Sequence, residues 1–153
     1  MPISREEKQR ICQLVGQGDT FKLVSVVKDL ASREATSTAD VLMSCKDDWY
    51  ENAAHMAAQT GQGRCIETLS RLLETDENRV TYFNTANRFN GDRPVHAAMR
   101  SGFFGLLKLL VAHGADPTVK NRFGDVADEY LGDHDPEEMQ KVMEEYKSRI
   151  VQA

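Results

Sequence analysis

The stretch that decides the fold runs from Gly91 to Asp116 and reads GDRPVHAAMRSGFFGLLKLLVAHGAD. Pro94 stands at the start of a short helical pattern, Gly102 interrupts it, and a leucine-rich segment then continues to Gly114. Proline is favoured in the first turn of a helix, and glycine is favoured just beyond its end. The stretch therefore predicts two helices, over 94–100 and 104–113, joined by a turn.

The same pattern recurs on both sides of this stretch. Upstream, His55 lies 41 residues before His96 and is followed by its own turn glycine, Gly61. Downstream, Gly124 lies 33 residues after Gly91. Repetition at such a period predicts a stack of similar helical units that share one continuous core.

The repeated residues resemble an ankyrin repeat. Arg93-Pro94-Val95-His96 resembles the Thr-Pro-Leu-His tetrapeptide that opens the first helix in that family, and Gly114-Ala115-Asp116 resembles its exit. The resemblance covers roughly residues 19–131. It implies an all-α fold, an ankyrin-repeat solenoid of about four stacked helix pairs with short hairpin turns.

Spacing divides the chain into four units, all within a single domain. We expect an N-terminal cap at 1–44, a second unit at 45–86, a third at 87–119 and a C-terminal cap at 120–153. The longer spacing of the second unit places about eight extra residues near 74–83, and the first unit has another insertion around 31–41. Further helices are expected over 21–30, 53–59 and 64–73, with 32–38 as a loop, and the stretch Asp135-Pro136-Glu137-Glu138 is expected to start a final helix.

Composition excludes several classes of protein. The 153 residues contain no run of 18 apolar residues and no apolar run behind a basic start, so we expect neither a membrane span nor a secretion signal. The three cysteines, Cys12, Cys45 and Cys65, have no metal-binding spacing. We therefore expect an intracellular monomer, cytoplasmic or nuclear, that has no cofactor or metal and binds neither nucleic acid nor membrane.

The charge is unevenly distributed along the chain. The net charge is −5, but residues 79–122 contain seven Lys or Arg and two Asp, whereas residues 125–153 contain nine acids and three bases. One interpretation is a solvated face beside an acidic cap. The other is a basic stripe that binds an acidic, partly apolar segment of a partner.

The repeat resemblance assigns structural roles to five residues. It implies that His55 and His96 are buried and hydrogen-bond the backbone of neighbouring turns, rather than bind a metal or transfer protons. Gly61, Gly102 and Gly114 are expected in left-handed turns.

Two departures from the repeat pattern lie in the second unit. Ala53 replaces the proline, which removes a preset helical dihedral. Tyr50 replaces a turn glycine, and because a tyrosine at positive φ is strained, a reshaped turn is expected there.

Binding residues are also implied by the resemblance. Ankyrin proteins commonly contact partners through the turn before each repeat and through the residues before the inter-helix glycine. Aromatic residues and arginine are common anchors of interfaces. The alternative is that the aromatic rings pack inside the stack. The positions matched in this chain are Trp49, Phe89, Asn90, Arg100, Arg122 and Phe123.

The sequence therefore predicts a non-catalytic module that binds a partner protein through the concave surface of turn tips and inner helices. No set of residues suits catalysis. One alternative is an inhibitor of a Rel-type transcription factor or of a kinase, because the segment 85–91 ahead of Val95-His96 resembles an inner repeat of the Rel inhibitors. A lesser alternative is an accessory domain of an enzyme.

Overall fold

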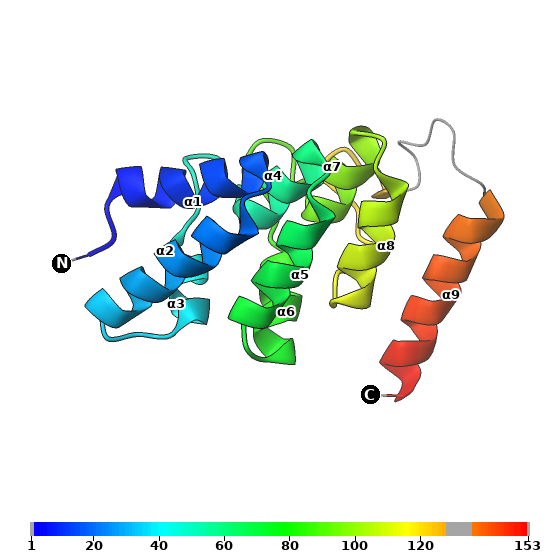
Figure 1. Ribbon diagram of the computed structural model, residues 1–153. Coiled ribbons are helices and arrows are strands. Elements are labelled where there is room, and N and C mark those ends of the chain that lie inside the picture. The colour runs from blue at the N-terminus through cyan, green and yellow to red at the C-terminus, as the bar shows by residue number, and fades with distance from the viewer. Residues whose placement is uncertain (1, 128–135, 153) are drawn as a thin grey trace.

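The computed structural model describes residues 2–127 and 136–152, which form α-helices and no β-strands (Figure 1). The helices are α1 (Arg5–Gln17), α2 (Thr20–Arg33), α3 (Thr38–Ser44), α4 (Ala53–Thr60), α5 (Gly63–Leu72), α6 (Asp76–Phe83), α7 (Pro94–Arg100), α8 (Phe104–Ala112) and α9 (Pro136–Gln152).

The helices form two rows. Figure 1 shows α1, α4 and α7 following one another in one row, with α2, α5 and α8 in the other. Each helix packs against its neighbour in the row and against the partner that follows it in the chain. One cluster of buried side chains extends from Ile11 on α1 to Val142 on α9. The fold is an all-α solenoid of stacked helix pairs, as the sequence predicts.

Local signals set the ends of the first pair. Ser4 Oγ accepts a hydrogen bond from Glu7 N, and Glu7 Oε2 accepts one from Ser4 N, which forms a capping box at the start of α1. Gly18 ends the helix at φ +73°, and Asp19 then caps α2 through Lys22 N. These caps turn the chain within two residues, so α1 and α2 lie side by side.

The two insertions differ from the expectation, because both contain a helix. The segment expected as a loop over 32–38 shortens to a connection, since α2 continues to Arg33 and α3 starts at Thr38. Ser37 caps α3 through Asp40 N, and Thr75 caps α6 through Asn78 N. Polar caps followed by apolar residues therefore stabilise short helices within both insertions.

Both inserted helices bind the unit that follows them. Thr38 Oγ1 at the start of α3 donates to Leu72 O at 2.6 Å. Asn84, directly after α6, donates through Nδ2 to Gly114 O at 2.9 Å and accepts from Asp116 N at 2.7 Å. The insertions thus act as a third layer that ties successive helix pairs together.

The last helix covers the C-terminal end of the stack. Met139 and Val142 are buried, Met143 and Tyr146 are half-buried, and Ile150 is exposed. Arg149 Nη1 donates to Val111 O on α8 at 3.0 Å. Asp135, expected as the cap of this helix, lies outside the described residues. No helix in the described ranges is long and apolar enough to cross a membrane.

Candidate protein-binding surface

Three turns project from the stack, before α4, before α7 and after α8, and they share one construction. In the third turn, Asn121 Oδ1 accepts from the backbone N–H of Phe123 and of Asp125, both at 3.0 Å. One side-chain oxygen thereby fixes the whole tip. The equivalent acceptors are Asp47 in the first turn, with Trp49 N and Glu51 N, and Asn87 in the second, with Asn90 N and Asp92 N.

Each turn is also bound to the one before it. Asn87 Nδ2 donates back to Glu51 Oε1 at 3.1 Å, and Asn121 Nδ2 donates back to Asp92 Oδ1 at 2.9 Å. An asparagine is needed at these two positions, because only an amide both accepts within its own turn and donates to the preceding one. Asp47 begins the row of turns, where an acceptor alone is sufficient.

Backbone hydrogen bonds continue the same connection. Arg88 N donates to Trp49 O at 2.7 Å, and Arg122 N donates to Asn90 O at 2.8 Å. Trp49 and Asn90 therefore occupy equivalent places, each directly before a residue at positive φ, Tyr50 or Gly91. The second turn contains one extra residue, and Phe89 is the residue that this longer tip projects.

This register explains where Asn90 lies. The repeat resemblance implies that Asn90 contacts a partner, but only 5% of it is exposed. Its Oδ1 accepts from Asp92 N at 3.0 Å, so the side chain is used inside the turn. Asn90 is consequently a residue of the turn framework and does not belong to the exposed surface.

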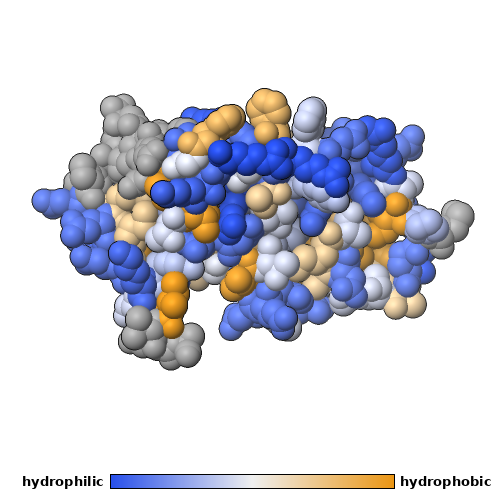
Figure 2. Space-filling view, turned by 180° about the vertical axis from the view of Figure 1, so that it is seen from behind, coloured by the Kyte–Doolittle hydropathy of each residue, from blue (hydrophilic) through white to orange (hydrophobic). Residues whose placement is uncertain are grey.

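The three aromatic rings at the tips face solvent. The exposed fractions are 57% for Trp49, 69% for Phe89 and 70% for Phe123. Trp49 and Phe89 meet edge to face, with ring centroids 5.8 Å apart. Figure 2 shows apolar groups projecting from one edge of the molecule beside a band of strongly hydrophilic side chains. Trp49 and Phe89 thus touch each other across two turns, and all three rings remain open to solvent.

Two arginines of this edge, Arg88 and Arg122, lie on the turns, and a third, Arg100, ends α7. The Arg88 guanidinium stacks 3.6 Å from the Tyr50 ring centroid, and Arg122 Nη1 donates to Arg88 O at 2.6 Å. Arg100 Nη2 pairs with Asp92 Oδ2 at 3.0 Å, where Asp92 is buried. The positive charges remain at the surface, but their positions are fixed before any partner arrives.

Tyr50 does not reshape the first turn. It adopts φ +60°, and its N–H still donates to Asp47 O at 3.0 Å, as Gly124 N does to Asn121 O at 3.1 Å in the third turn. The expected distortion is therefore absent, and Tyr50 keeps a strained left-handed backbone conformation. Contact of the ring with Arg88 offsets part of that cost.

His55 and His96 are fully buried and connect their own helix starts to later turns. His55 Nδ1 accepts from Asn52 N at 3.2 Å, and Nε2 donates to Asp92 O at 3.0 Å. His96 Nδ1 accepts from Arg93 N at 3.1 Å, and Nε2 lies 3.1 Å from Val119 O. Both rings must be neutral with the proton on Nε2, and burial lowers the pKa of each.

The missing proline of the second unit is compensated by the inserted helix. Ala53 occupies the proline position, and its N–H donates to the hydroxyl of Tyr82 at 3.2 Å. Tyr82 lies on α6 and is fully buried. Asn52 Nδ2 also donates to Tyr82 O at 3.0 Å. The N–H group that proline would lack has gained a partner, so the helix start is held at this position.

The turn glycines adopt positive φ: +74° at Gly61, +81° at Gly102 and +112° at Gly114. Space as well as conformation requires glycine at the first of these. A Cβ on Gly61 would lie 2.9 Å from the Phe103 ring, so the ring packs directly on the backbone there.

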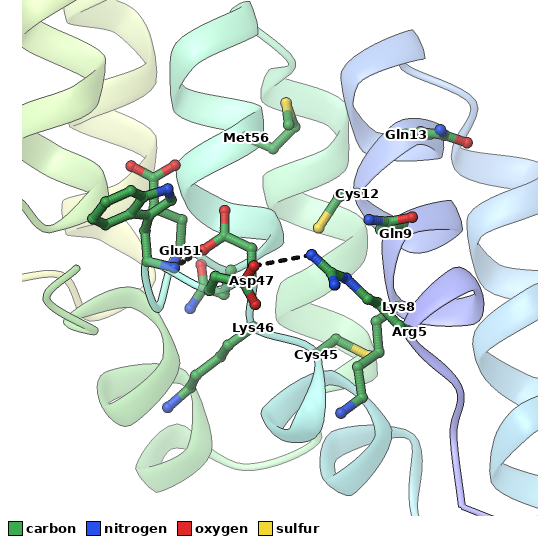
Figure 3. Close-up of a pocket in the computed structure, with 13 residues that line it drawn as sticks. Arg5, Lys8, Gln9, Cys12, Gln13, Cys45, Lys46, Asp47, Glu51 and Met56 are labelled. Atoms are coloured by element: carbon green, nitrogen blue, oxygen red, sulfur yellow. Dashed lines mark hydrogen bonds and ion pairs between the residues drawn. The ribbon is translucent and has the colours of Figure 1, made fainter. Parts of the chain in front are cut away.

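A cavity of about 620 Å³ opens between α1, the first turn and α4 (Figure 3). Cys12, Cys45 and Met56 contribute sulfur atoms to it, and Trp49 forms part of its wall. Within the described residues, no three His, Cys, Asp or Glu side chains are grouped so that they could hold a metal ion.

Comparison with known proteins identifies the repeat. A family model described as ankyrin repeats (3 copies) matches residues 20–121. A curated relative from Caenorhabditis elegans, the ankyrin repeat and LEM domain-containing protein 2 homolog, is 26% identical over 151 residues. The alignment covers 86% of this chain and 25% of the relative, so the chain spans about a quarter of that protein's length.

A solved structure has the same fold along nearly the whole chain. It belongs to the crystal structure of the yeast ribosomal protein Rps3 in complex with its chaperone Yar1. The matching chain superimposes with a TM-score of 0.68 at 25% identity, covering 97% of this chain and 95% of that one. The similarity in fold therefore extends over nearly the full described length of both chains.

Proposed function

Since the chain belongs to the ankyrin-repeat family, we propose that it is a non-catalytic module that binds a partner protein through its turns and inner helices. The contact surface is named here the turn-tip surface. It consists of Trp49, Arg88, Phe89, Arg100, Arg122 and Phe123. The units at 1–44, 45–86, 87–119 and 120–153 then act together, because consecutive turns contribute to one surface.

The observation that carries this proposal is the exposure of three large rings on rigid turns. Trp49, Phe89 and Phe123 are each more than half exposed, although burying an aromatic side chain is worth about 1.5–3 kcal/mol. Side-chain and backbone hydrogen bonds fix the tips, so little conformational entropy is lost when a partner binds. Exposed aromatic residues on a preorganised framework are typical of interface anchors.

The chemistry of the surface indicates the chemistry of the partner. Arg88 and Arg122 directly precede Phe89 and Phe123 and place positive charge beside these rings, while the Arg100 guanidinium pairs with Asp92. A partner segment that is acidic and partly apolar would pair with these charges and cover the rings. Charges at the rim of an interface chiefly accelerate association and set its salt dependence. We accordingly propose a monomer that binds such a segment of an intracellular protein.

A second candidate is a protein that keeps its partner unassembled. The similar fold from the complex of a ribosomal protein with its chaperone favours this candidate, because the match covers 97% of the chain. Inhibition of a Rel-type transcription factor or of a kinase would use the same surface. A role as an accessory domain of an enzyme would require contact with a catalytic subunit.

The decisive experiment compares two variants in an affinity pull-down from native cells, followed by a titration of the captured protein. The triple change Trp49→Ala, Phe89→Ala and Phe123→Ala should weaken binding at least about 30-fold, since single anchors contribute about 2 kcal/mol or more. Phe21→Ala is the matched control, because Phe21 is an aromatic residue that is 84% exposed on α2, outside the turns.

Each outcome decides the proposal. Loss of binding in the triple variant but not in the control supports the turn-tip surface, provided that circular dichroism shows both variants folded. Unchanged affinity in the folded triple variant would refute it. Equal weakening by Phe21→Ala would refute it as well, because binding would then follow exposed aromatic area in general.

A further inference from the structure

The cavity beside the first turn is lined by both apolar and acidic side chains. Sulfur atoms of Cys12, Cys45 and Met56 supply apolar surface, and the ring of Trp49 adds to it. Carboxylates of the first turn also line the cavity: Asp47, Asp48 and Glu51. Such a combination fits a long side chain that has an apolar stem and a cationic end.

The side of the first turn that lines the cavity is negatively charged. The pKa of the Cys12 thiol is raised to about 11, mainly by burial, then by the neighbouring Cys45, and further by the negative charge of Asp47 and Glu51. The two lysines of the cavity do not neutralise this part of it. Lys46 Nζ lies 5.3 Å from the Tyr50 ring centroid, and Figure 3 shows Lys8 and Lys46 extending away from Asp47.

A guanidinium of the chain itself already occupies this position. Arg5 Nη2 on α1 pairs with Asp48 Oδ2 at 2.9 Å, and Figure 3 marks this ion pair across the cavity. Both side chains are highly exposed, at 75% and 79%. An ion pair this exposed contributes little to stability, so a competing cation exchanges with it readily.

We propose that this cavity receives an arginine side chain of a partner protein, which displaces Arg5 from Asp48. The incoming stem lies against the sulfur atoms and the Trp49 ring, while its guanidinium takes the carboxylate that Arg5 vacates. Because Trp49 contacts Phe89, the cavity is continuous with the turn-tip surface. This inference rests on the proposed function only for the position of the partner, since binding of a free arginine derivative needs no partner.

Trp49 is the single tryptophan of the chain, so its fluorescence reports on this cavity directly. The probe is Nα-acetyl-arginine amide, titrated at low salt, and the matched control is the uncharged citrulline derivative of the same shape. The arginine probe should give a saturable change in emission, and the citrulline derivative should not. Raising the salt concentration should weaken the response, because the interaction is one of exposed charges.

Variants of the ion pair provide the sharper test. Arg5→Ala removes the internal competitor, so the probe should bind about two- to fivefold tighter, the factor expected of an exposed ion pair. Asp48→Asn should weaken the probe by a similar factor, about two- to fivefold, because it removes the charge that the guanidinium pairs with. Arg10→Ala is the control, because Arg10 is an exposed arginine on α1 that does not line the cavity, and it should change nothing.

The direction of the Arg5 effect separates the proposal from a structural role. If Arg5 merely held α1 against the first turn, its loss would loosen the cavity and weaken the probe, which would overturn the inference. Equal binding of the citrulline derivative would overturn it too. A failed probe titration, together with lost partner binding in the triple-alanine variant, would refute this cavity and leave the turn-tip surface standing.

Discussion

The N-terminal ends of α4 and α7 have the same geometry but reach it with different residues. The capping residues have similar backbone angles, φ −105° and ψ −175° at Asn52, and φ −96° and ψ 168° at Arg93. In both, a buried histidine four residues into the motif accepts from the capping N–H. They differ at the next position, where α7 has Pro94 and α4 has Ala53.

The difference shows how a repeat tolerates loss of its proline. Pro94 has no N–H, so the start of α7 needs no partner for that group. Ala53 has one, and Tyr82 from the inserted helix α6 accepts it. The helix start that is specified locally in α7 is completed in α4 by a residue 29 positions away. A degenerate repeat therefore depends on an insertion that the regular repeat can omit.

The histidines, which both helix starts share, should give the largest effect. His96→Ala leaves Arg93 N–H and the carbonyl of Val119 without their partner in a buried site, so we expect a loss of about 3 kcal/mol in the free energy of unfolding. His55→Ala should cost about the same. Urea denaturation followed by circular dichroism measures both, and two-state unfolding within one cooperative core is the condition for comparing them.

The pH dependence provides the control for this prediction. Burial lowers the pKa of His55 and of His96 in the folded chain, so the unfolded chain binds more protons below its histidine pKa of about 6.5. Stability is thus complete above about pH 6.5 and is lost as the pH falls, by up to about 1.4 kcal/mol per pH unit for each histidine. Each alanine variant should have a shallower slope, and an unchanged slope would contradict the neutral, buried rings.

The next prediction addresses the residue in which the two starts differ. Tyr82→Phe keeps the packing of the ring but leaves Ala53 N–H unpaired, which should cost about 1–2 kcal/mol of stability. Ala53→Pro in the same background removes that N–H and should restore most of the loss. Asn52 already has the extended backbone that a residue before proline requires.

A double-mutant cycle with these two changes measures the coupling directly. In the otherwise unchanged chain, Ala53→Pro should raise stability less than it does in the Tyr82→Phe background. There it removes the N–H of a hydrogen bond that is already formed with the hydroxyl of Tyr82. Additive effects of the two changes would mean that the hydroxyl of Tyr82 is not the partner of the helix start, and the account of α4 given above would then be wrong.

Much of the repeat could be predicted from the sequence, because local signals specify it. Pro94 and Gly102 bracket α7 at its predicted bounds, 94–100, and α8 ends one residue before the predicted position. The turns lie near 47–51, 87–92 and 121–125, where the matched glycines and the repeat period place them. In each case the residue that decides the conformation lies within a few positions of the structure that it forms.

Other features could not be found in this way. Comparison of the repeats treats α3 and α6 as insertions, because neither has a counterpart in the 33-residue unit. Their caps, Ser37 and Thr75, were a local signal that could have identified them. The partnership of Ala53 with Tyr82 and the extra residue of the second turn depend on contacts between units, which the spacing of glycines does not encode. The binding role of the turn-tip surface stays a prediction.

The smallest expected effect concerns the same position in two turns, Tyr50 and Gly124. Both have positive φ, +60° and +80°, and a Cβ on Gly124 would have no atom within 4 Å. Gly124→Ala should therefore cost about 1 kcal/mol through backbone conformation alone.

Tyr50→Gly relieves that strain but loses the stacking of Arg88 and gains entropy in the unfolded chain, so stability should change by less than about 0.5 kcal/mol. Tyr50→Ala keeps the strain and loses the ring, and it should be the least stable variant at this position. Urea denaturation of the three variants tests the order, and a Tyr50→Gly chain that is much more stable than the parent would mean that the ring of Tyr50 contributes nothing against its strain. The tyrosine would then be retained for what it presents to a partner beside Trp49 rather than for the turn that it helps to build.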